Sequence, residues 1–264
     1  MQIGDLVVEP ILDGTMRMPV TAFAGTTVEQ WAPHQRLLDA DGRLAFALGG
    51  FLVRAPGDRL VLVDAGIGPR SGLVRNGEGD YHGGALLESL AAAGVRPADI
   101  TDVVFTHLHF DHVGWASQDD VPVFPQATYR CDTRDWAHFR DNERVQPILA
   151  PVEDRLATWD ASGPLCPGID ALAAPGHTPG STILVLSSGT ARGLLLGDVV
   201  HCPVELLDDE WSGLGDVDPA LAQRTRNALA REIEGTETPV AAAHFPGMVF
   251  GRLLKANGRR AWVT

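Results

Sequence analysis

Four side chains that can bind metal ions lie within six residues of the sequence: His107, His109, Asp111 and His112. Alternate residues of an extended segment point to the same side. His107 and His109 could therefore share one ion, while Asp111 and His112 turn towards another. Neutral imidazole nitrogens and carboxylate oxygens suit zinc and similar divalent ions. A turn or a cap would give no reason for this spacing, so the segment predicts a metal site.

Three further candidate ligands stand farther along the chain, each beside a glycine or at the end of an apolar run. They are His177 in APGHTPG, Asp198 in LLLGDVVH and His244 in PVAAAHFPG. A lone histidine or aspartate at a strand end is usually a cap. These three residues therefore become candidate metal ligands only in combination with the first four. Seven ligands of these types are enough for two ions if the ions share one carboxylate.

The elements that must position these ligands are short apolar runs typical of buried strands. The runs cover residues 59–66, 102–109, 182–189, 193–198 and 239–244. Several candidate ligands stand in or just beyond these runs. The sequence therefore predicts a metal site built at strand ends.

Helical patterns separate the apolar runs. Residues 86–93 place their leucines on one face, and Gly94 is a suitable residue for the end of that helix. Asp218 and Pro219 suit the N-cap and the first position of a second helix, whose apolar residues recur at helical spacing as far as Ile233. Strands alternating with helices indicate an α/β fold.

No linker divides the chain, so we predict one α/β domain over residues 1–264. Residues 14–50 and 118–168 are expected to be loop or helical excursions near the site. We predict that they determine which substrate shapes the site accepts. Within the second excursion, residues 132–160 are predicted to be helical in pieces that two prolines interrupt.

The charge and the cysteines exclude several classes of protein. The chain carries 34 acidic and 21 basic side chains, a net charge of −13, which repels phosphate backbones and excludes a general nucleic-acid binder. Cys131, Cys166 and Cys202 are too widely spaced for a metal motif and are expected to be reduced thiols. No signal peptide or membrane-spanning run is apparent, so we expect a cytoplasmic protein without a membrane partner. A homodimer remains an open alternative to a monomer.

The motif HLHFDH, followed by His177, Asp198 and His244, resembles the metallo-β-lactamase superfamily. That resemblance implies a four-layer αββα sandwich with a dinuclear metal site at one edge. It assigns His107, His109 and His177 to one ion and Asp111, His112 and His244 to the second, with Asp198 bridging both. It also places Asp64 where a carboxylate orients ligand imidazoles, although a turn cap explains that residue equally well.

The branches of the superfamily differ at several positions that can be identified in this sequence. Asp198 argues against lactamases of the metallo type, and His109 against flavodiiron oxidoreductases, which have glutamate at that position. The net charge argues against the tRNA-processing branch, and we expect no room after His244 for the helical domain of glyoxalase II. The remaining resemblance is to the lactonase and methyl parathion hydrolase-like group. His201 stands where homoserine lactonases typically have tyrosine, which favours the methyl parathion hydrolase side.

The resemblance implies a dinuclear metal-dependent hydrolase that cleaves an ester or lactone of a small-molecule substrate by attack of a metal-bridging hydroxide. The ions are expected to be zinc, with manganese, iron or cobalt as alternatives. Asp111 and His201 are the predicted catalytic residues, the first orienting the attacking oxygen and the second stabilising the oxyanion. A phosphotriesterase-type hydrolase, a mononuclear iron oxygenase of the persulfide type and an inactive binding protein are the alternatives.

Aromatic residues that could line the substrate pocket, or belong to the core, are Phe23, Phe46, Trp115, Phe139 and Trp211.

Overall fold

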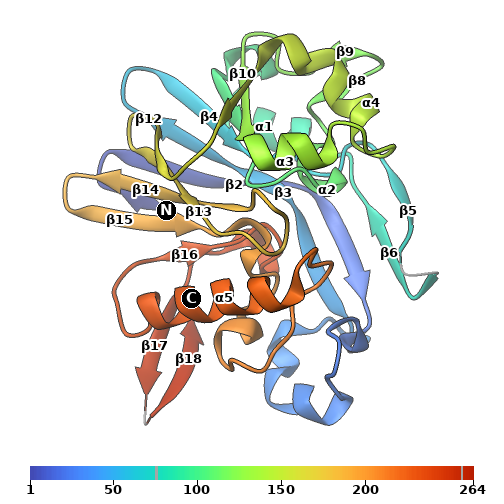
Figure 1. Ribbon diagram of the computed structural model, residues 1–264, viewed down its shortest axis with the longest axis vertical. Coiled ribbons are helices and arrows are strands. Elements are labelled where there is room, and N and C mark those ends of the chain that lie inside the picture. Colours follow the sequence, from blue (N-terminus) through green and yellow to red (C-terminus); the bar gives the residue numbers. More distant parts are fainter. Residues whose placement is uncertain (75–76, 257) are drawn as a thin grey trace.

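The computed structural model describes residues 1–74, 77–256 and 258–264, and two β-sheets form its centre (Figure 1). The larger sheet has nine strands in the order β11-β10-β7-β4-β3-β2-β6-β5, with β1 paired to β2. Strands β4, β7, β10 and β11 run parallel, and the other pairs are antiparallel. The strand bounds are β1 Gln2–Ile3, β2 Leu6–Met18, β3 Leu44–Ala55, β4 Arg59–Val63, β5 Ser71–Val74, β6 Gly79–His82, β7 Asp102–Val104, β10 Thr128–Asp132 and β11 Leu156–Trp159.

The smaller sheet has five strands in the order β12-β13-β14-β15-β16, antiparallel except for the last pair. Its bounds are β12 Gly163–Cys166, β13 Ile169–Ala173, β14 Thr182–Ser188, β15 Ala191–Leu195 and β16 Val240–Ala241. Two short hairpins stand apart from both sheets. They pair β8 Ser117–Gln118 with β9 Val121–Pro122, and β17 Arg252–Ala256 with β18 Arg259–Val263.

The helices are short except for the last one. The α-helices are α1 Leu86–Ala92, α2 Phe110–Val113, α3 Thr133–Phe139, α4 Gln146–Leu149 and α5 Pro219–Ile233. The 3-10 helices are η1 Val20–Ala22, η2 Val28–Leu37, η4 Pro97–Asp99, η5 Ala150–Arg155, η6 Gly197–Val199, η7 Pro203–Leu206 and η8 Pro246–Met248.

Three buried clusters show how the layers pack. Between the sheets, Val61 and Phe51 of the larger sheet meet Leu184 of the smaller one. On the outer face of the larger sheet, α1, α3 and α4 cover the strands through residues such as Leu90. On the outer face of the smaller sheet, α5 buries residues such as Leu229 (Figure 1). The order helix, sheet, sheet, helix is the predicted αββα sandwich.

The predicted strands and helices at the centre are confirmed, although the strands are shorter than the apolar runs. Helix α1 ends as expected: Gly94 adopts a φ of 73°, and the N–H of Val95 donates to the carbonyl of Leu90. Helix α5 begins as expected, because the side chain of Asp218 accepts a hydrogen bond of 2.9 Å from the N–H of Leu221.

The prediction of a loop-rich segment over residues 14–50 is wrong at both ends. Strand β2 covers the start of this segment and β3 covers its end, and the two strands pair with each other from Val7 to Met18 on β2. The glycines that suggested a loop are required by close backbone contacts inside the sheet. A Cβ at Gly50 would overlap the backbone carbonyl oxygens of Val63 and Asp64.

The excursion predicted over residues 118–168 also contains sheet. Strands β10 and β11 lie in it and extend the larger sheet next to β7. Residues 156–159 form strand β11, although the sequence predicts a helical piece there. Pro147 and Pro151 stand in the first turns of α4 and η5, where a missing N–H costs nothing.

Candidate metal centre

The seven predicted ligands stand in loops and first helical turns that follow strands of both sheets. His107 and His109 follow β7, and α2 begins directly after His109, which places Asp111 and His112 in its first turns. The remaining ligands come from the region of the smaller sheet: His177 lies between β13 and β14, Asp198 lies in η6 after β15, and His244 lies after β16.

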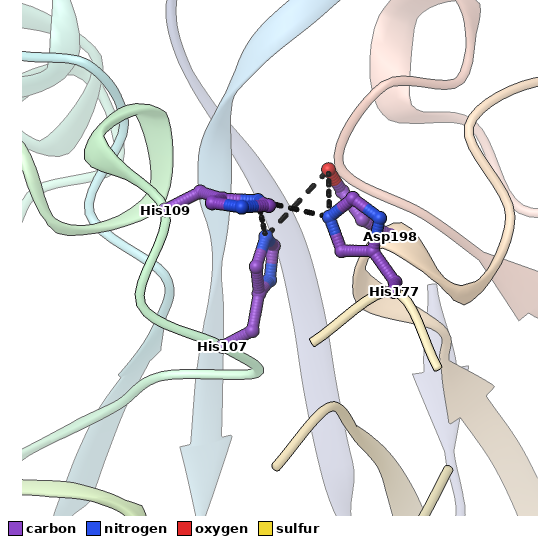
Figure 2. Close-up of side chains that lie close together, drawn as sticks. All are labelled: His107, His109, His177 and Asp198. Carbon is purple, nitrogen blue, oxygen red and sulfur yellow. Dashed lines mark hydrogen bonds and ion pairs between the residues drawn. The ribbon is translucent and has the colours of Figure 1, made fainter. Parts of the chain in front are cut away.

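The first group brings together His107, His109, His177 and Asp198 (Figure 2). The Nδ1 of His109 lies 3.0 Å from the Nε2 of His107 and 2.9 Å from the Nε2 of His177. The Oδ2 of Asp198 lies 3.7 Å and 3.6 Å from the same two Nε2 atoms. Three imidazole nitrogens and one carboxylate oxygen therefore converge on one point.

The second group contains Asp111, His112 and His244, and it adjoins the first through Asp198. The Nε2 of His244 lies 3.6 Å from the Oδ2 of Asp111 and 3.1 Å from the Oδ2 of Asp198. The Nε2 of His112 lies 3.2 Å from the other oxygen of Asp198. Asp198 therefore contacts imidazoles of both groups, which is the arrangement that a bridging carboxylate needs.

Both groups fit divalent cations. All their side chains except His109 are buried. Within the described part of the chain, the His112 Nε2 and Asp198 Oδ1 atoms lie 3.2 Å apart without forming a hydrogen bond, and neither has another hydrogen-bond partner. A buried polar atom left without a partner is costly, and a cation between these atoms would satisfy both. Imidazole and carboxylate together favour zinc and its neighbours over magnesium or calcium.

The electrostatics keep several of these imidazoles neutral, the form that binds a metal ion. Burial lowers the pKa of His107 well below its ordinary value, with His112 nearby adding to the effect. Burial, together with neighbouring His177, lowers the pKa of His109 to about 3. Burial acts in the same direction on His112, but Asp198 and Asp64 outweigh it and raise the pKa of His112.

Asp64 orients part of the site. It accepts hydrogen bonds of 2.8 Å from both the N–H and the hydroxyl of Thr106, and its Oδ2 lies 2.9 Å from the Nδ1 of His112. The hydroxyl of Thr106 also lies 3.1 Å from the Nδ1 of His107. The geometry therefore matches the orienting role that the resemblance implies for Asp64, because the second nitrogen of each ring is held while the first faces the ion position.

Two further orienting groups are not evident in the sequence. The Nδ1 of His177 lies 3.0 Å from the Oδ1 of Asp216, and the Nδ1 of His244 lies 2.9 Å from the carbonyl oxygen of Ala47. Asp216 follows a glycine-rich stretch that is typical of a loop, and a carbonyl group carries no sequence signal at all. Both groups are far from their histidines along the chain, so only the fold reveals the contacts.

Glu205, Arg226 and Asp216 form a buried ion network behind the site. The Nε of Arg226 lies 3.0 Å from Glu205 Oε1, and its Nη2 lies 3.3 Å from Asp216 Oδ2. Glu205 Oε2 accepts the backbone N–H of His201 at 2.6 Å, and Asp216 holds His177. Arg226 stands on α5, so the buried ion network connects this helix to two sides of the centre.

A comparison with known protein families agrees with the geometry. Residues 50–244 match the model of the metallo-beta-lactamase superfamily, which is more than half of the chain. The chain belongs to this superfamily. Among curated relatives, metallo-beta-lactamase domain-containing protein 1 of Mus musculus is 33% identical over 177 residues, which cover 66% of this chain and 59% of the mouse protein. The N-acyl homoserine lactonase of Bacillus thuringiensis is 28% identical, covering 68% of this chain and 74% of the lactonase.

Solved structures of superfamily members superpose on the whole chain. AidC, a dizinc quorum-quenching lactonase in complex with a product, has a TM-score of 0.85 at 25% identity and covers 100% of this chain and 95% of its own. The hydrolase AbOPH has the same TM-score and the same coverage at 26% identity. The metallo-β-lactamase fold and the likeness to lactonases are therefore shown. No helix in the described ranges of the chain is both long and apolar enough to cross a membrane.

A cavity of about 580 Å³ opens over the metal centre of this superfamily member, and ligands of both groups reach its wall. Of the aromatic residues predicted to line it, Phe46 and Phe139 do so. Trp115 is buried in the core, and its Nε1 donates to Asp13 at 2.8 Å. The rest of the apolar lining comes from Met16, Met18, Phe110, Val145, Leu214 and Val217.

Phe23 and Trp211 pack against each other, with ring centroids 6.0 Å apart, in a core cluster beside the cavity. They are absent from the described cavity lining, so the alternative interpretation of both as core residues is the right one. Their rings support the ends of β2 and β3, because Met18 and Leu44 belong to the same cluster.

His201 lines the cavity beside the metal centre, with its ring centroid 4.9 Å from that of His177. Its Nε2 lies 3.5 Å from the Oδ2 of Asp198. Cys202 is buried outside both ligand groups, and burial raises the pKa of its thiol well above its ordinary value. The predicted catalytic role of His201 stays a prediction, with the side chain placed where it can reach a substrate.

Proposed function

We propose that the protein is a dinuclear metal-dependent hydrolase that cleaves an ester or lactone bond of a small molecule. The observation that carries this proposal is Asp198 beside the cavity. Its Oδ2 lies 3.7 Å from His107 and 3.6 Å from His177 of the first group, and its Oδ1 lies 3.2 Å from His112 of the second. The dizinc lactonase AidC, similar over the full length of this chain, supports the same chemistry. A cavity of about 580 Å³ suits a small molecule rather than a polymer.

Two bound divalent ions would polarise the carbonyl group and make a water molecule acidic enough to attack near neutral pH. The chain's own residues position the substrate and handle the protons. Asp111 lies at the cavity wall, where its carboxylate can orient the attacking water and accept its proton. His201 can donate a hydrogen bond to the substrate oxygen that gains negative charge. The proton that Asp111 accepts then passes to the leaving alkoxide, so an ester releases an acid and an alcohol and a lactone opens to a hydroxy acid.

The second ligand group supports a hydrolase over the alternative of a mononuclear iron oxygenase. Asp111, His112 and His244 stand close enough together to hold an ion of their own. An enzyme that uses one iron would have no need of this buried group. The grouping also argues against an inactive binding protein, because clustered buried polar side chains are costly without a ligand.

The proposal is tested by measuring metal content and activity on the same protein. We expect about two equivalents of zinc, manganese, iron or cobalt per chain after purification without chelator. The metal-loaded protein should hydrolyse members of a panel of lactones, aryl esters and phosphotriesters, and chelation should abolish the activity. Activity on the phosphotriesters alone would replace the ester and lactone proposal with the phosphotriesterase alternative. A single iron under saturating metal, with no hydrolysis, would contradict both.

A further inference from the structure

A second cavity adjoins the one over the metal centre. Its volume is about 740 Å³, and Phe110 and Arg144 line both cavities. Its lining residues stand in or near β5 and β6, in α2 and in the segment that joins α3 to α4, and Figure 1 shows where these elements lie in the fold. A substrate held at the metal centre could therefore extend past Phe110 into this space. We name it the arginine cavity, and its described lining is Arg70, Leu73, Val74, Gly77, Tyr81, Phe110 and Arg144.

The arginine cavity is positive in a strongly acidic protein. The chain has a net charge of −13, yet the described lining of this cavity contains two arginines and no acidic residue. Many arginines of the chain pair with carboxylates, as Arg54 does with Glu9 at 2.8 Å. Within the described ranges of the chain, the guanidinium groups of Arg70 and Arg144 have no such partner. Two unpaired cations facing one cavity favour an anionic ligand.

The local structure holds both arginines at the cavity. The guanidinium carbon of Arg144 lies 5.7 Å from the centre of the Phe110 ring, close enough for a cation–π contact. Tyr81 meets the same ring edge-on, with the ring centroids 6.0 Å apart. The backbone of Arg70 is hydrogen-bonded on both sides, to the carbonyl of Gly68 at 2.7 Å and from the N–H of Gly83 at 2.8 Å.

We propose that the arginine cavity binds a carboxylate carried by the substrate at a distance from the bond that is cleaved. The substrate class is then an ester or lactone with a carboxylate at its far end. Guanidinium groups suit this role because they donate two parallel hydrogen bonds to one carboxylate. The apolar residues Leu73, Val74 and Phe110 would pack along the carbon chain between the two ends. This inference rests on the proposed hydrolase function.

The first experiment compares matched pairs of esters with the metal-loaded protein. The anionic series is the mono-4-nitrophenyl esters of glutaric, adipic and suberic acid, which vary the distance to the carboxylate. The neutral series is the 4-nitrophenyl esters of the alkanoic acids with the same number of carbons. We expect the ratio of kcat/KM, anionic over neutral, to fall about tenfold in Arg144→Gln and in Arg70→Gln at the chain length that reaches the cavity.

Arg192→Gln is the matched control. Arg192 is an exposed residue of β15 and is absent from both cavities, so this change removes the same charge without touching the site. The ratio should stay at the wild-type value in Arg192→Gln. Charge reversal gives a second test, because Arg144→Glu should favour an ester that ends in a trimethylammonium group over its carboxylate counterpart.

The second experiment measures binding without turnover. Isothermal titration compares glutaric acid monoanilide with neutral valeranilide, two amides that resist hydrolysis, on the wild-type protein and on the variants Arg144→Gln, Arg70→Gln and Arg192→Gln. We expect the ratio of affinities, anionic amide over neutral amide, to fall about tenfold in Arg144→Gln and Arg70→Gln and to stay unchanged in Arg192→Gln.

The two experiments separate this inference from the proposed function. If no ester is hydrolysed, the proposed function fails, and the amide titrations still decide whether the arginine cavity binds carboxylates. If an anionic preference persists unchanged in both arginine variants, the metal ions are its source, and the subsite is refuted while the hydrolase stands. The proposed subsite would also be refuted if the wild-type protein showed equal kcat/KM values for the anionic and neutral esters and equal affinities for the two amides.

Discussion

At the scale of single residues, Asp198 connects the two ligand groups. Its carboxylate oxygens lie 3.2 Å from His112 and 3.1 Å from His244, and it also approaches the histidines of the first group. The neighbouring imidazoles keep its pKa well below the ordinary value, although burial acts in the opposite direction. Asp198 therefore carries a negative charge in a buried position, which is stabilised best when cations lie on both sides.

We predict that Asp198→Asn lowers the metal content from about two equivalents per chain to about one or fewer, because a neutral amide cannot bridge two cations as a carboxylate does. Inductively coupled plasma mass spectrometry of the purified variant measures this directly. Asp120→Asn serves as the control, because Asp120 is exposed and stands in neither ligand group. Unchanged occupancy in Asp198→Asn would refute the bridging role.

His201 lines the cavity beside the metal centre, and a substitution can show whether it acts in catalysis. We predict that His201→Ala lowers kcat/KM by about 10- to 1,000-fold, as expected for the loss of one hydrogen bond to a developing oxyanion. Metal content should hold, since His201 belongs to neither ligand group. Kinetics on the ester and lactone panel, together with metal analysis, test this prediction.

A purely structural role for His201 has a different signature. His201→Ala would then shift the urea unfolding midpoint and leave the kinetics of the folded enzyme unchanged. His82→Ala, at an exposed position on β6, controls for the loss of an imidazole elsewhere. His201→Tyr adds a comparison of substrates: the tyrosine typical of homoserine lactonases should shift preference from aryl esters towards lactones, because its hydroxyl reaches farther than an imidazole nitrogen.

At the scale of elements, helix α5 supports the centre through a single charged side chain. The side chain of Arg226 is 1% exposed and lies between Glu205 and Asp216, the carboxylates behind His201 and His177. A buried ion pair adds little net stability, but removing one partner leaves the others charged and unpaired. The position of α5 and the geometry of the metal centre are therefore coupled.

We predict that Arg226→Met destabilises the protein by about 3–5 kcal/mol, because two buried carboxylates lose their cation. Urea unfolding monitored by circular dichroism measures the change. Arg231→Met on the same helix is the control, since the Arg231 side chain is 58% exposed in its ion pair with Asp209 and its loss should cost less than about 1 kcal/mol. Combining Arg226→Met with Glu205→Gln and Asp216→Asn should recover part of the loss, and an absence of recovery would contradict the charge argument.

At the scale of the whole molecule, the metal centre ties together regions that are far apart in the chain. Its ligands follow β7 of the larger sheet and β15 and β16 of the smaller one. Ions bound there stabilise only the folded state, because the unfolded chain cannot gather these side chains. Overall stability and metal binding are therefore linked.

We predict that removing the metals lowers Tm and that adding zinc restores it. An ion present at 100 times its Kd stabilises the fold by about 2.7 kcal/mol, and each kcal/mol shifts Tm by about 2–4 °C for a protein of this size class. Differential scanning calorimetry with and without chelator measures the shift. The Asp198→Asn variant should show a smaller shift. A Tm that is the same with and without chelator would contradict the link between metal binding and stability.

The metal ligands could be predicted from the sequence because their signal is local. Few side chains bind divalent ions, and a dense cluster of them after an apolar run has little other explanation. The cap of α5 at Asp218 and the end of α1 at Gly94 were equally evident, because helix ends depend on adjacent residues. The first four ligands, and the residues that form each helix end, stand within a few positions of one another. His177, Asp198 and His244 stand farther along the chain and became candidate metal ligands only in combination with the first four, through the resemblance to the superfamily.

The orienting groups, the buried ion network and the arginine cavity were decided only by the tertiary structure. Asp216 reaches His177 across 39 positions of the chain, and Arg70 and Arg144 meet at one cavity although different elements carry them. Gly50 suggested a loop because the close approach of another strand, which excludes a side chain there, leaves no mark on its neighbours in sequence. The sequence by itself determined the chemistry of the centre, because ligand type is a property of single residues and four of the seven ligands form one local cluster. The fold determined which groups orient, support and surround that centre, because those contacts exist only after distant strands have packed.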